Sequence, residues 1–312
     1  MNKFMFSIFT VLVSVNAFSW GAKGHQIIAY VGGQSAEVGK TFWQSNLVSL
    51  RQLSTVPDRI WKAPVTKTQE APSHFFQVDY YFTPSEYSNI LNFPNDYSTA
   101  VSKYSESIII KNGTAPWRIR QLYQLALKSL KAKDMKSALQ YTGTMTHYIG
   151  DLSQPLHVSE NYDGQLTGND GIHSYFENKI IVDELNLRTL VQKRVDQLLK
   201  NDIFLKQFKG NLMDIILLEI KRSISFQNQV LKNDTELGRN KKGDAVQLEL
   251  AIDRMADGAA TLAVILNKLW KESGLIARAS PMTIQDPAWL QTDYSKLDSS
   301  GAKALLIRDD CF

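Results

Sequence analysis

Apolar side chains recur at helical spacing along most of this sequence. Four series stand out, from Ile119 to Leu130, from Met135 to Ile149, from Leu212 to Ile224 and from Leu248 to Leu269. Apolar residues three and four positions apart lie on one face of an α-helix, so each series predicts a helix that buries one side. We therefore expect an all-α fold in which long helices pack around one another.

Turn-forming residues predict where these helices end. Breaks are expected at Asn112-Gly113, at Lys133-Asp134, across residues 161–171 and across residues 232–244, because Gly, Asn and Asp favour turns. One segment, residues 74–82, has appreciable strand character. The sequence contains no internal repeat and no linker rich in Pro, Gly or Ser, which favours a single domain.

The N-terminal residues have the pattern of a secretory signal peptide. Lys3 precedes an apolar run from Phe4 to about Val15, which is shorter than the roughly 20 residues that span a bilayer. The segment Ala17-Phe18-Ser19 supplies small residues for a cut before Trp20. An uncleaved membrane anchor is the alternative, and the short run argues against it. We expect residues 1–19 to be removed on export, leaving a secreted or periplasmic domain over residues 20–312.

Cysteine usage and charge narrow the function classes. The sequence has one cysteine, Cys311, so an exported domain must be stabilised by its core or by metals and not by internal disulfides. A formal net charge of +4 is compatible with a polyanionic substrate, but no Lys/Arg run indicates a dedicated duplex-DNA binder. The phosphate-loop, dinucleotide and serine-hydrolase signatures GxxxxGK(S/T), GxGxxG and GxSxG are missing, as is CxxC.

Histidines have the most informative surroundings, and the sequence has five of them. In the segment HYIGDLSQPLH, His147 and Asp151 are four residues apart near the end of a helix. Imidazole and carboxylate then share one face and can share a metal ion. Gly143 and Gly150 are expected to leave room for that ion. Taken alone, such a pair is most often a hydrogen bond on a helix surface.

Two further features favour a metal over a surface hydrogen bond. Pro155 ends the helix and turns the chain, so His157 comes back toward the first pair. In the segment GIHSYFEN, His173 and Glu177 repeat the four-residue spacing at the start of the next helix. Helical bundles build interior metal sites from such pairs on neighbouring helices. Zinc suits a set of imidazole and carboxylate ligands without thiolates.

Three more residues of ligand type are ordinary when taken singly. His25 is consistent with a first-turn histidine, Asp58 with a turn residue after a proline, and His74 with a core or edge histidine. Together with the other segments they form an ordered set: WGAKGH, TVPDRIW, SHFF, HYIGDLSQPLH and HSYFEN. This set resembles the three-zinc phosphodiesterase superfamily. That superfamily contains the single-strand-specific zinc nucleases and 3′-nucleotidases of moulds, plants and bacteria, and the bacterial zinc phospholipases C.

The resemblance implies a cluster of three Zn2+ ions at the centre of the helical domain. One zinc would be held by Asp58, His74 and His147, and Asp151 would bridge it to a second zinc. A close zinc pair lowers the pKa of a bridging water to near neutrality and so supplies a hydroxide that attacks phosphorus. Asp58, beside that pair in the superfamily, is expected to be the catalytic residue that orients or deprotonates the water.

The other two zinc ions would use the remaining ligands. The α-amino group and carbonyl of Trp20, together with His25, would hold the second zinc, so that cleavage before Trp20 creates a ligand. His157, His173 and Glu177 would hold the third. Every histidine of the sequence is then assigned to a metal.

The metal ligands do not separate the nuclease branch from the phospholipase branch. The short WGxxGH spacing favours a nuclease, whereas Glu177 stands where typical nucleases have Asp. We expect a secreted zinc-dependent endonuclease that hydrolyses single-stranded RNA and DNA to 5′-phosphates and has 3′-nucleotidase activity. Phospholipase C, acting on phospholipid, is the alternative, and a zinc-sequestering or structural metal protein is a third hypothesis. No stable protein partner is implied.

Four residues are expected to bind substrate. Phe75 follows a ligand and could stack an unpaired base, although it could equally contact a lipid tail or the core. Arg59 and Lys62 could meet phosphate, because Trp61 occupies the place of the basic residue in the superfamily. The last of the four is Asn178. The base-reading Asp of the superfamily is replaced by Gln77, and we therefore expect relaxed base preference.

Overall fold

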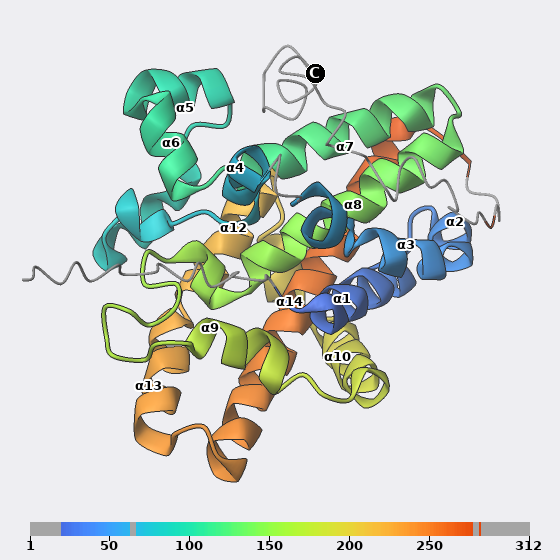
Figure 1. Cartoon of the computed structure of the whole chain (residues 1–312). Coiled ribbons are helices and arrows are strands. Elements are labelled where there is room, and N and C mark those ends of the chain that lie inside the picture. Colours follow the sequence, from blue (N-terminus) through green and yellow to red (C-terminus); the bar gives the residue numbers. More distant parts are fainter. Residues whose placement is uncertain (1–19, 63–66, 277–280, 282–312) are drawn as a thin grey trace, which may run out of the picture.

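The structure is a computed structural model that describes residues 20–62, 67–276 and 281 of the chain (Figure 1). The expected signal peptide, residues 1–19, lies outside the described residues, and so does Cys311.

Helices make up the regular structure. Their bounds are α1 Ala22–Ser35, α2 Lys40–Ser45, α3 Leu47–Leu53, α4 Lys67–Glu70, α5 Tyr97–Tyr104, α6 Glu106–Asn112, α7 Ala115–Lys131, α8 Met135–Ser153, α9 Ile172–Ser174, α10 Glu184–Leu198, α11 Asp202–Lys206, α12 Leu212–Ile224, α13 Gln227–Leu237 and α14 Lys241–Ser273. Short 3-10 turns span Ala71–His74, Val78–Tyr80, Pro84–Asn92 and Pro155–Val158, and π-helical turns span Pro57–Trp61 and Tyr175–Lys179. Within the described ranges no residue is in a β-strand, so the expected all-α fold is confirmed.

The core is built around α8 and α14. Helix α8 packs against α7, α3, α1, α12 and α14, and α14 in turn packs against α1, α10 and α7 (Figure 1). All four apolar series fall on long helices of this assembly, on α7, α8, α12 and α14. Fully buried members include Leu130, Met145 and Leu262. Burial of each side chain of this size stabilises the folded state by roughly 1.5–3 kcal/mol. The helices therefore pack through the faces that the sequence pattern predicts.

Three of the four predicted breaks are confirmed. Helix α6 ends at Asn112, and Gly113 follows with φ of 100°. Lys133, with φ of 62°, separates α7 from α8, and residues 161–171 form a loop. The break expected across residues 232–244 was too long.

The break between α13 and α14 is confined to residues 238–240. Gly238 adopts φ of 67° directly after α13, and Asn240 caps α14 by accepting a hydrogen bond from the backbone N–H of Lys242 at 3.0 Å. One residue with positive φ and one capping side chain are sufficient to join two helices, so the neighbouring polar residues remain helical.

The segment at residues 74–82 is not a strand, contrary to its sequence pattern. The backbone is extended at Phe75, but the N–H of Phe76 donates to the carbonyl of His157 at 3.0 Å and the N–H of Gln77 donates to the carbonyl of Asn112 at 2.8 Å. Two successive residues thus pair with two separate segments, the turn Pro155–Val158 and the end of α6, and a 3-10 turn begins at Val78. The alternation of apolar residues reflects individual burial and not a sheet face.

A buried ion network joins α12 to α14. The guanidinium of Arg222 donates from Nε to both carboxylate oxygens of Asp257, at 3.0 and 2.9 Å, and from Nη2 to Glu219 at 2.5 Å. Thr261 also donates to Glu219, at 2.5 Å. Burial, together with the negative charge of Asp257, raises the pKa of Glu219 to about 7. These partners pair the polar side chains with one another inside the core.

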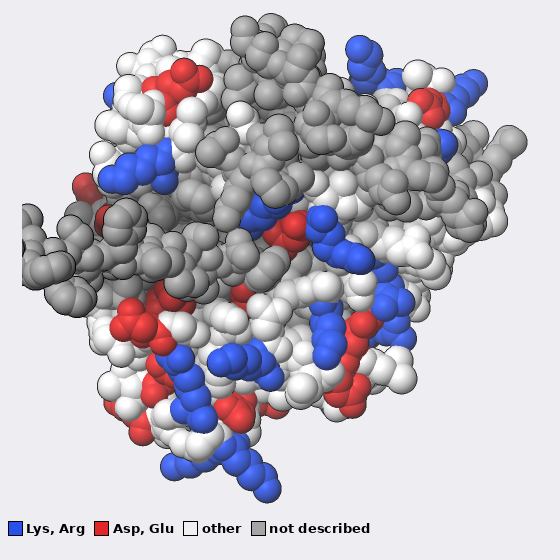
Figure 2. All heavy atoms as spheres, in the orientation of Figure 1, with Lys and Arg blue, Asp and Glu red and all other residues white. Residues whose placement is uncertain are grey.

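Charged residues of both signs share the outer surface. Figure 2 shows Lys and Arg side chains interspersed with Asp and Glu on the face that carries α1 and α10. None of the helices in the described ranges combines the length and the hydropathy needed to span a bilayer.

Candidate metal centre

Five histidines from separate segments converge inside the helical assembly. Each has a side chain at least 94% buried. They are His25 of α1, His74 of the turn Ala71–His74, His147 of α8, His157 of the turn Pro155–Val158 and His173 of α9. Carboxylates accompany them in three groups whose ligand atoms lie within 4.8 Å of one another. The structure therefore brings together residues that are spread over more than 150 positions of the sequence.

The first group is His74, His147 and Asp151, with Asp58 beside it, and Asp58 also forms a group with His25 and His147. Nε2 of His147 lies 3.0 Å from Nδ1 of His74, and Oδ2 of Asp151 lies 3.2 Å from that Nδ1 and 3.4 Å from that Nε2. Oδ1 of Asp58 lies 3.6 Å from His74 and 3.8 Å from His147. Bonds of about 2.0–2.2 Å around a tetrahedral zinc place ligand atoms roughly 3.3–3.6 Å apart, so this set has the size that zinc requires.

Asp151 also faces a second metal position. Its Oδ1 lies 3.4 Å from Nε2 of His25, while Oδ2 faces the first group. The rings of His25 and His147 stack with their centroids 3.9 Å apart. The two oxygens of one carboxylate therefore point to two different sets of imidazoles, which is the geometry of a bridging ligand.

Trp20 is held at the start of α1, next to this second position. Its indole N–H donates to Oγ of Ser153 at 3.1 Å, and its ring contacts Phe176 at a centroid distance of 5.6 Å. The next residue, Gly21, donates its N–H to the carbonyl of Glu177 at 3.2 Å. The side chain of Trp20 is fully buried, and these contacts hold the residue in place just before α1, the helix that carries His25.

The third group contains His157, His173 and Glu177. The two Nε2 atoms lie 3.1 Å apart, and Oε2 of Glu177 lies 3.0 Å from His173 and 3.6 Å from His157. Nδ1 of His157 faces the carbonyl of His74 at 2.6 Å, and Nδ1 of His173 faces the carbonyl of Tyr162 at 2.8 Å. Because a carbonyl only accepts, both Nδ1 atoms carry the proton and, in the neutral rings, both Nε2 lone pairs face each other. A metal cation between the two Nε2 atoms would satisfy both lone pairs, and so would a proton on one of them, which the charge of Glu177 favours by raising the pKa of His173.

Electrostatics also indicate that a cation belongs at Asp151. The carboxylate is fully buried, and among the described residues neither of its oxygens accepts a hydrogen bond. Burial, reinforced by the negative charge of Asp58, raises the pKa of Asp151 well above its usual range. Burial also lowers the pKa of His25 and His74 well below theirs, so these rings are neutral ligands. Neutral imidazoles and carboxylates without thiolate fit zinc.

Two of the carboxylates lie in π-helical turns. Asp58 is in Pro57–Trp61, and Glu177 is in Tyr175–Lys179, which continues directly from α9. The sequence predicts an ordinary helix start for His173 and Glu177, whereas the structure gives one α-helical turn followed by a wider one. Such widened turns re-aim a side chain and are frequent at functional sites.

The glycines of α8 make room for side chains and not for an ion. A Cβ on Gly150 would lie 2.9 Å from Nδ1 of His25, and a Cβ on Gly143 would lie 2.5 Å from the side chain of Leu53. The expectation that both glycines leave space for the metal was therefore wrong. Gly150 admits the ring of His25, and Gly143 admits Leu53.

A small cavity of about 150 Å³ opens onto the first and second positions. It is lined by Gly21, Ala22, His25, Thr55, Asp58, Arg59 and Asn178. Lys62 lies close by, with Nζ 3.4 Å from Oδ1 of Asp58. Arg59 and Asn178 are exposed at this cavity, whereas Phe75 is half-buried and is not part of its lining. The structure thus gathers three of the four expected substrate-binding residues around Asp58.

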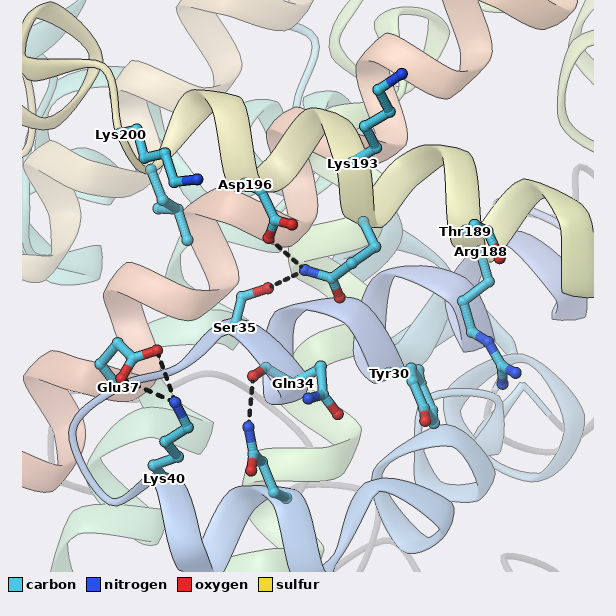
Figure 3. A pocket seen from close by; sticks show the side chains of 13 residues that line it. Tyr30, Gln34, Ser35, Glu37, Lys40, Arg188, Thr189, Lys193, Asp196 and Lys200 are labelled. Atoms are coloured by element: carbon cyan, nitrogen blue, oxygen red, sulfur yellow. Dashed lines mark hydrogen bonds and ion pairs between the residues drawn. The ribbon is translucent and has the colours of Figure 1, made fainter.

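A larger cavity of about 910 Å³ lies elsewhere, between α1, α2 and α10 (Figure 3). Arg188 reaches from α10 to the ring of Tyr30 on α1, with 4.3 Å from its guanidinium carbon to the ring centroid. Lys40 pairs with Glu37 at 3.1 Å. None of the nine expected metal ligands lines this cavity, and no sequence motif pointed to it.

The all-helical domain thus buries three groups of histidines and carboxylates that could each hold a metal ion. The chain matches the S1/P1 Nuclease family over residues 20–271 and belongs to that family. The match begins at Trp20 and ends in α14.

Local similarity to other proteins is more restricted. A phospholipase C of Bacillus cereus is 45% identical over 56 residues, which cover 18% of this chain and 19% of the relative. A probable serine protease of Bradyrhizobium tropiciagri is 34% identical over 92 residues, covering 24% of this chain and 12% of the relative. The chain thus spans less than a fifth of the length of these curated relatives.

Solved structures include alpha-toxin from an avian strain of Clostridium perfringens. It superposes with a TM-score of 0.46 at 17% sequence identity, over 82% of this chain and 66% of the toxin chain.

The contact between Gly150 and His25 predicts that Gly150→Ala weakens metal binding. Alanine is intrinsically better than glycine in a helix by about 1 kcal/mol, but its Cβ would push the imidazole away from Asp151. We expect zinc affinity to fall on the order of 10-fold, measured by competition with a chelator. The matched control is Gly32→Ala on α1, whose Cβ would instead meet Leu262 at 2.5 Å. That variant should lose about 1–3 kcal/mol of stability by overpacking and keep its zinc affinity. Equal zinc affinity in the two variants would contradict the prediction.

Proposed function

We propose that this protein is a zinc-dependent phosphodiesterase that hydrolyses single-stranded RNA and DNA to 5′-phosphates and removes 3′-phosphates from nucleotides. Membership in the S1/P1 Nuclease family supports the reaction class. The observation that carries the proposal is the Asp151 carboxylate, fully buried, with one oxygen toward His25 and the other toward His74 and His147. Burial raises the pKa of this carboxyl, so it is ionised in that position only with cations beside it.

Nine residues would hold three zinc ions. The proposed ligands are Trp20, His25, Asp58, His74, His147, Asp151, His157, His173 and Glu177. Zinc bound there would lower the pKa of a coordinated water and polarise phosphate oxygens. The Trp20 ligand would be its α-amino group, whose pKa near 7.7–8.0 allows it to lose a proton to a metal at neutral pH.

Asp58 is placed to hold a proton during the reaction. It lines the small cavity, and its side chain is 10% exposed, so solvent reaches it. Burial alone would raise the pKa of Asp58, but His147, His74 and Lys62 together lower it below its usual value. The group is therefore an ionised carboxylate at neutral pH and can accept a hydrogen bond, or a proton, from a water in the cavity.

Arg59 and Asn178 supply donors at the mouth of the same cavity. Arg59 offers guanidinium N–H groups that suit phosphate oxygens, and Asn178 already donates from Nδ2 to Oε1 of Glu177 at 3.2 Å. A phosphate seated between them would lie beside Asp58. Both residues would therefore position a phosphodiester and not recognise a base.

Base preference is expected to be relaxed. Gln77 replaces the base-reading Asp of the superfamily, and the nearby Asp79 is engaged elsewhere. Its Oδ2 accepts from Oγ of Ser159 at 2.7 Å, and its Oδ1 accepts from the N–H of Glu160 at 2.8 Å. With both oxygens occupied, Asp79 cannot take over base recognition without breaking a loop contact.

Phospholipase C remains the second candidate activity. The 45% identity to the Bacillus cereus phospholipase C over 56 residues favours it, as does Glu177 in place of Asp. The family match over residues 20–271 favours the nuclease.

Chelation and substrate choice test the proposal directly. The protein beginning at Trp20 is incubated with single-stranded RNA and, separately, with phosphatidylcholine vesicles, each with and without a chelator. We expect RNA hydrolysis that is abolished by the chelator and restored by added zinc. Chelator-sensitive cleavage of phosphatidylcholine alone would favour the second candidate. If neither substrate is cleaved, both enzyme functions are wrong.

Asp58→Asn tests the role of the carboxylate. The amide keeps an oxygen for the metal but cannot take up a proton, so kcat should fall on the order of 10²-fold or more while zinc content is retained. Asp96→Asn, an exposed carboxylate paired with Arg120, is the matched control and should keep full activity. A variant at Asp58 with all its zinc and near-normal turnover would remove this role.

An N-terminal extension tests Trp20 as a ligand. Two alanines placed before Trp20 convert its α-amino group into an amide, which is a poor ligand at neutral pH. We expect the extended protein to bind one zinc fewer than the protein beginning at Trp20, measured by atomic emission, and to lose most of its activity. Full zinc content and activity in the extended protein would show that the amino group is not used.

A further inference from the structure

We propose that Glu70 is a positioning residue that acts through His74 and sets the affinity of the first zinc position. The inference rests on the proposed zinc cluster, and Glu70 itself is not among the proposed ligands. It follows from the way each histidine is oriented inside the centre.

Three of the histidines are oriented by backbone carbonyls. Nδ1 of His147 donates to the carbonyl of Ser54 at 2.8 Å, and the corresponding atoms of His157 and His173 donate to the carbonyls of His74 and Tyr162. In each case the Nε2 atom is left to face the other ligands. The main chain alone therefore fixes which nitrogen of these rings carries the proton.

His74 is turned the opposite way. Its Nδ1 faces Asp151 at 3.2 Å and Asp58 at 3.6 Å, so this ring would meet the metal through Nδ1. Its Nε2 makes no hydrogen bond within the described part of the chain, and Oε1 of Glu70 faces it at 3.4 Å. A side-chain carboxylate thus stands where the other three rings have a backbone carbonyl.

Glu70 is itself fixed by buried partners. The hydroxyl of Tyr148 donates to Oε1, and Nη2 of Arg118 donates to Oε2 at 3.2 Å. Arg118 also donates to Oγ of Ser73 at 3.2 Å and to Gln121 at 2.6 Å. Glu70 has no exposed surface. Its partner Tyr148 follows His147 in the chain, and Ser73, which accepts from Arg118, precedes His74. The carboxylate cannot turn away from His74 without losing these contacts.

The position of Glu70 decides where His74 carries its proton. Nδ1 faces two carboxylates, which favour a proton on Nδ1, and that proton would occupy the place of the metal. Glu70 offers an equivalent anion at Nε2 and so favours the ring form whose Nδ1 lone pair is free for zinc. Without Glu70, zinc would have to displace a proton from Nδ1 of His74.

The test compares Glu70→Gln with a matched buried carboxylate. Glu219→Gln removes a buried carboxylate that is also paired with an arginine, but on α12. Both variants and the wild type, each beginning at Trp20, are loaded with zinc and titrated with a chelator. We expect one of the bound zinc ions to be held 10- to 100-fold more weakly in Glu70→Gln, and all to be held normally in Glu219→Gln.

A spectroscopic readout separates positioning from general stability. In protein labelled with ¹⁵N-histidine, the imidazole nitrogens of zinc-free wild type should show His74 with a proton on Nε2. Glu70→Gln should shift that population toward a proton on Nδ1, and Tyr148→Phe, which frees one side of Glu70, should give a smaller shift in the same direction. A change in thermal stability alone would not move this signal.

The outcomes distinguish this inference from the proposed function. A wild type that binds no zinc overturns the zinc cluster itself. A wild type that binds zinc, with Glu70→Gln unchanged in both affinity and ring protonation, overturns the role of Glu70 and leaves the cluster in place. If Glu70→Gln does not fold, Tyr148→Phe decides, because unchanged affinity and ring protonation in that variant would also overturn the inference.

Discussion

The interaction on which the rest of this structure depends is the burial of a carboxylate that accepts no hydrogen bond from the described part of the chain. Asp151 lies in the interior of an all-helical core, and both of its oxygens face imidazoles whose pKa values burial has lowered. Burying an unpaired anion costs several kcal/mol, which a hydrophobic core does not recover. Burial accordingly raises the pKa of Asp151, so the carboxylate is ionised in this arrangement only if cations complete it. Packing of the fold and binding of metal are for that reason linked. Helix α8 contributes to both, because it supplies Asp151 and much of the core.

The sequence predicted the helices well, because their stability comes from periodic apolar faces that can be read directly. It predicted residues 74–82 poorly, because the backbone there is held by two hydrogen bonds to distant segments, at His157 and Asn112, and the sequence pattern does not show these contacts. The same limit applies to the glycines of α8. A small residue on a helix face indicates a close neighbour, but only the tertiary structure shows that the neighbour is a ring of His25 and not an ion.

For the centre, four-residue spacing predicted the pairs His147 with Asp151 and His173 with Glu177, but it did not lead to the pair Glu70 and His74. His147 and Asp151 share a regular helix, and four-residue spacing places them on one face. Glu70 and His74 have the same spacing, yet Pro72 and the change from α4 to a 3-10 turn conceal the pair. Arg118 and Tyr148, which hold Glu70, carry no local signal, because their role exists only after α7 and α8 have packed. Candidate metal ligands can therefore be predicted from the sequence pattern, whereas the residues that orient them can be identified only from the tertiary structure.

His74 connects the metal positions to each other. Its side chain belongs to the first group, while its backbone carbonyl accepts from His157 and so orients a ligand of the third. The N–H of Phe76, two residues on, donates back to the carbonyl of His157, so one side-chain and one backbone hydrogen bond join the two segments. The turn Ala71–His74 can therefore not shift for one metal position without shifting for the other. A residue that fixes this turn, as Glu70 does through Tyr148 and Arg118, acts on two positions at once. The first and third groups are therefore coupled through this turn, and Glu70, a carboxylate that is not a proposed ligand, holds the turn in place.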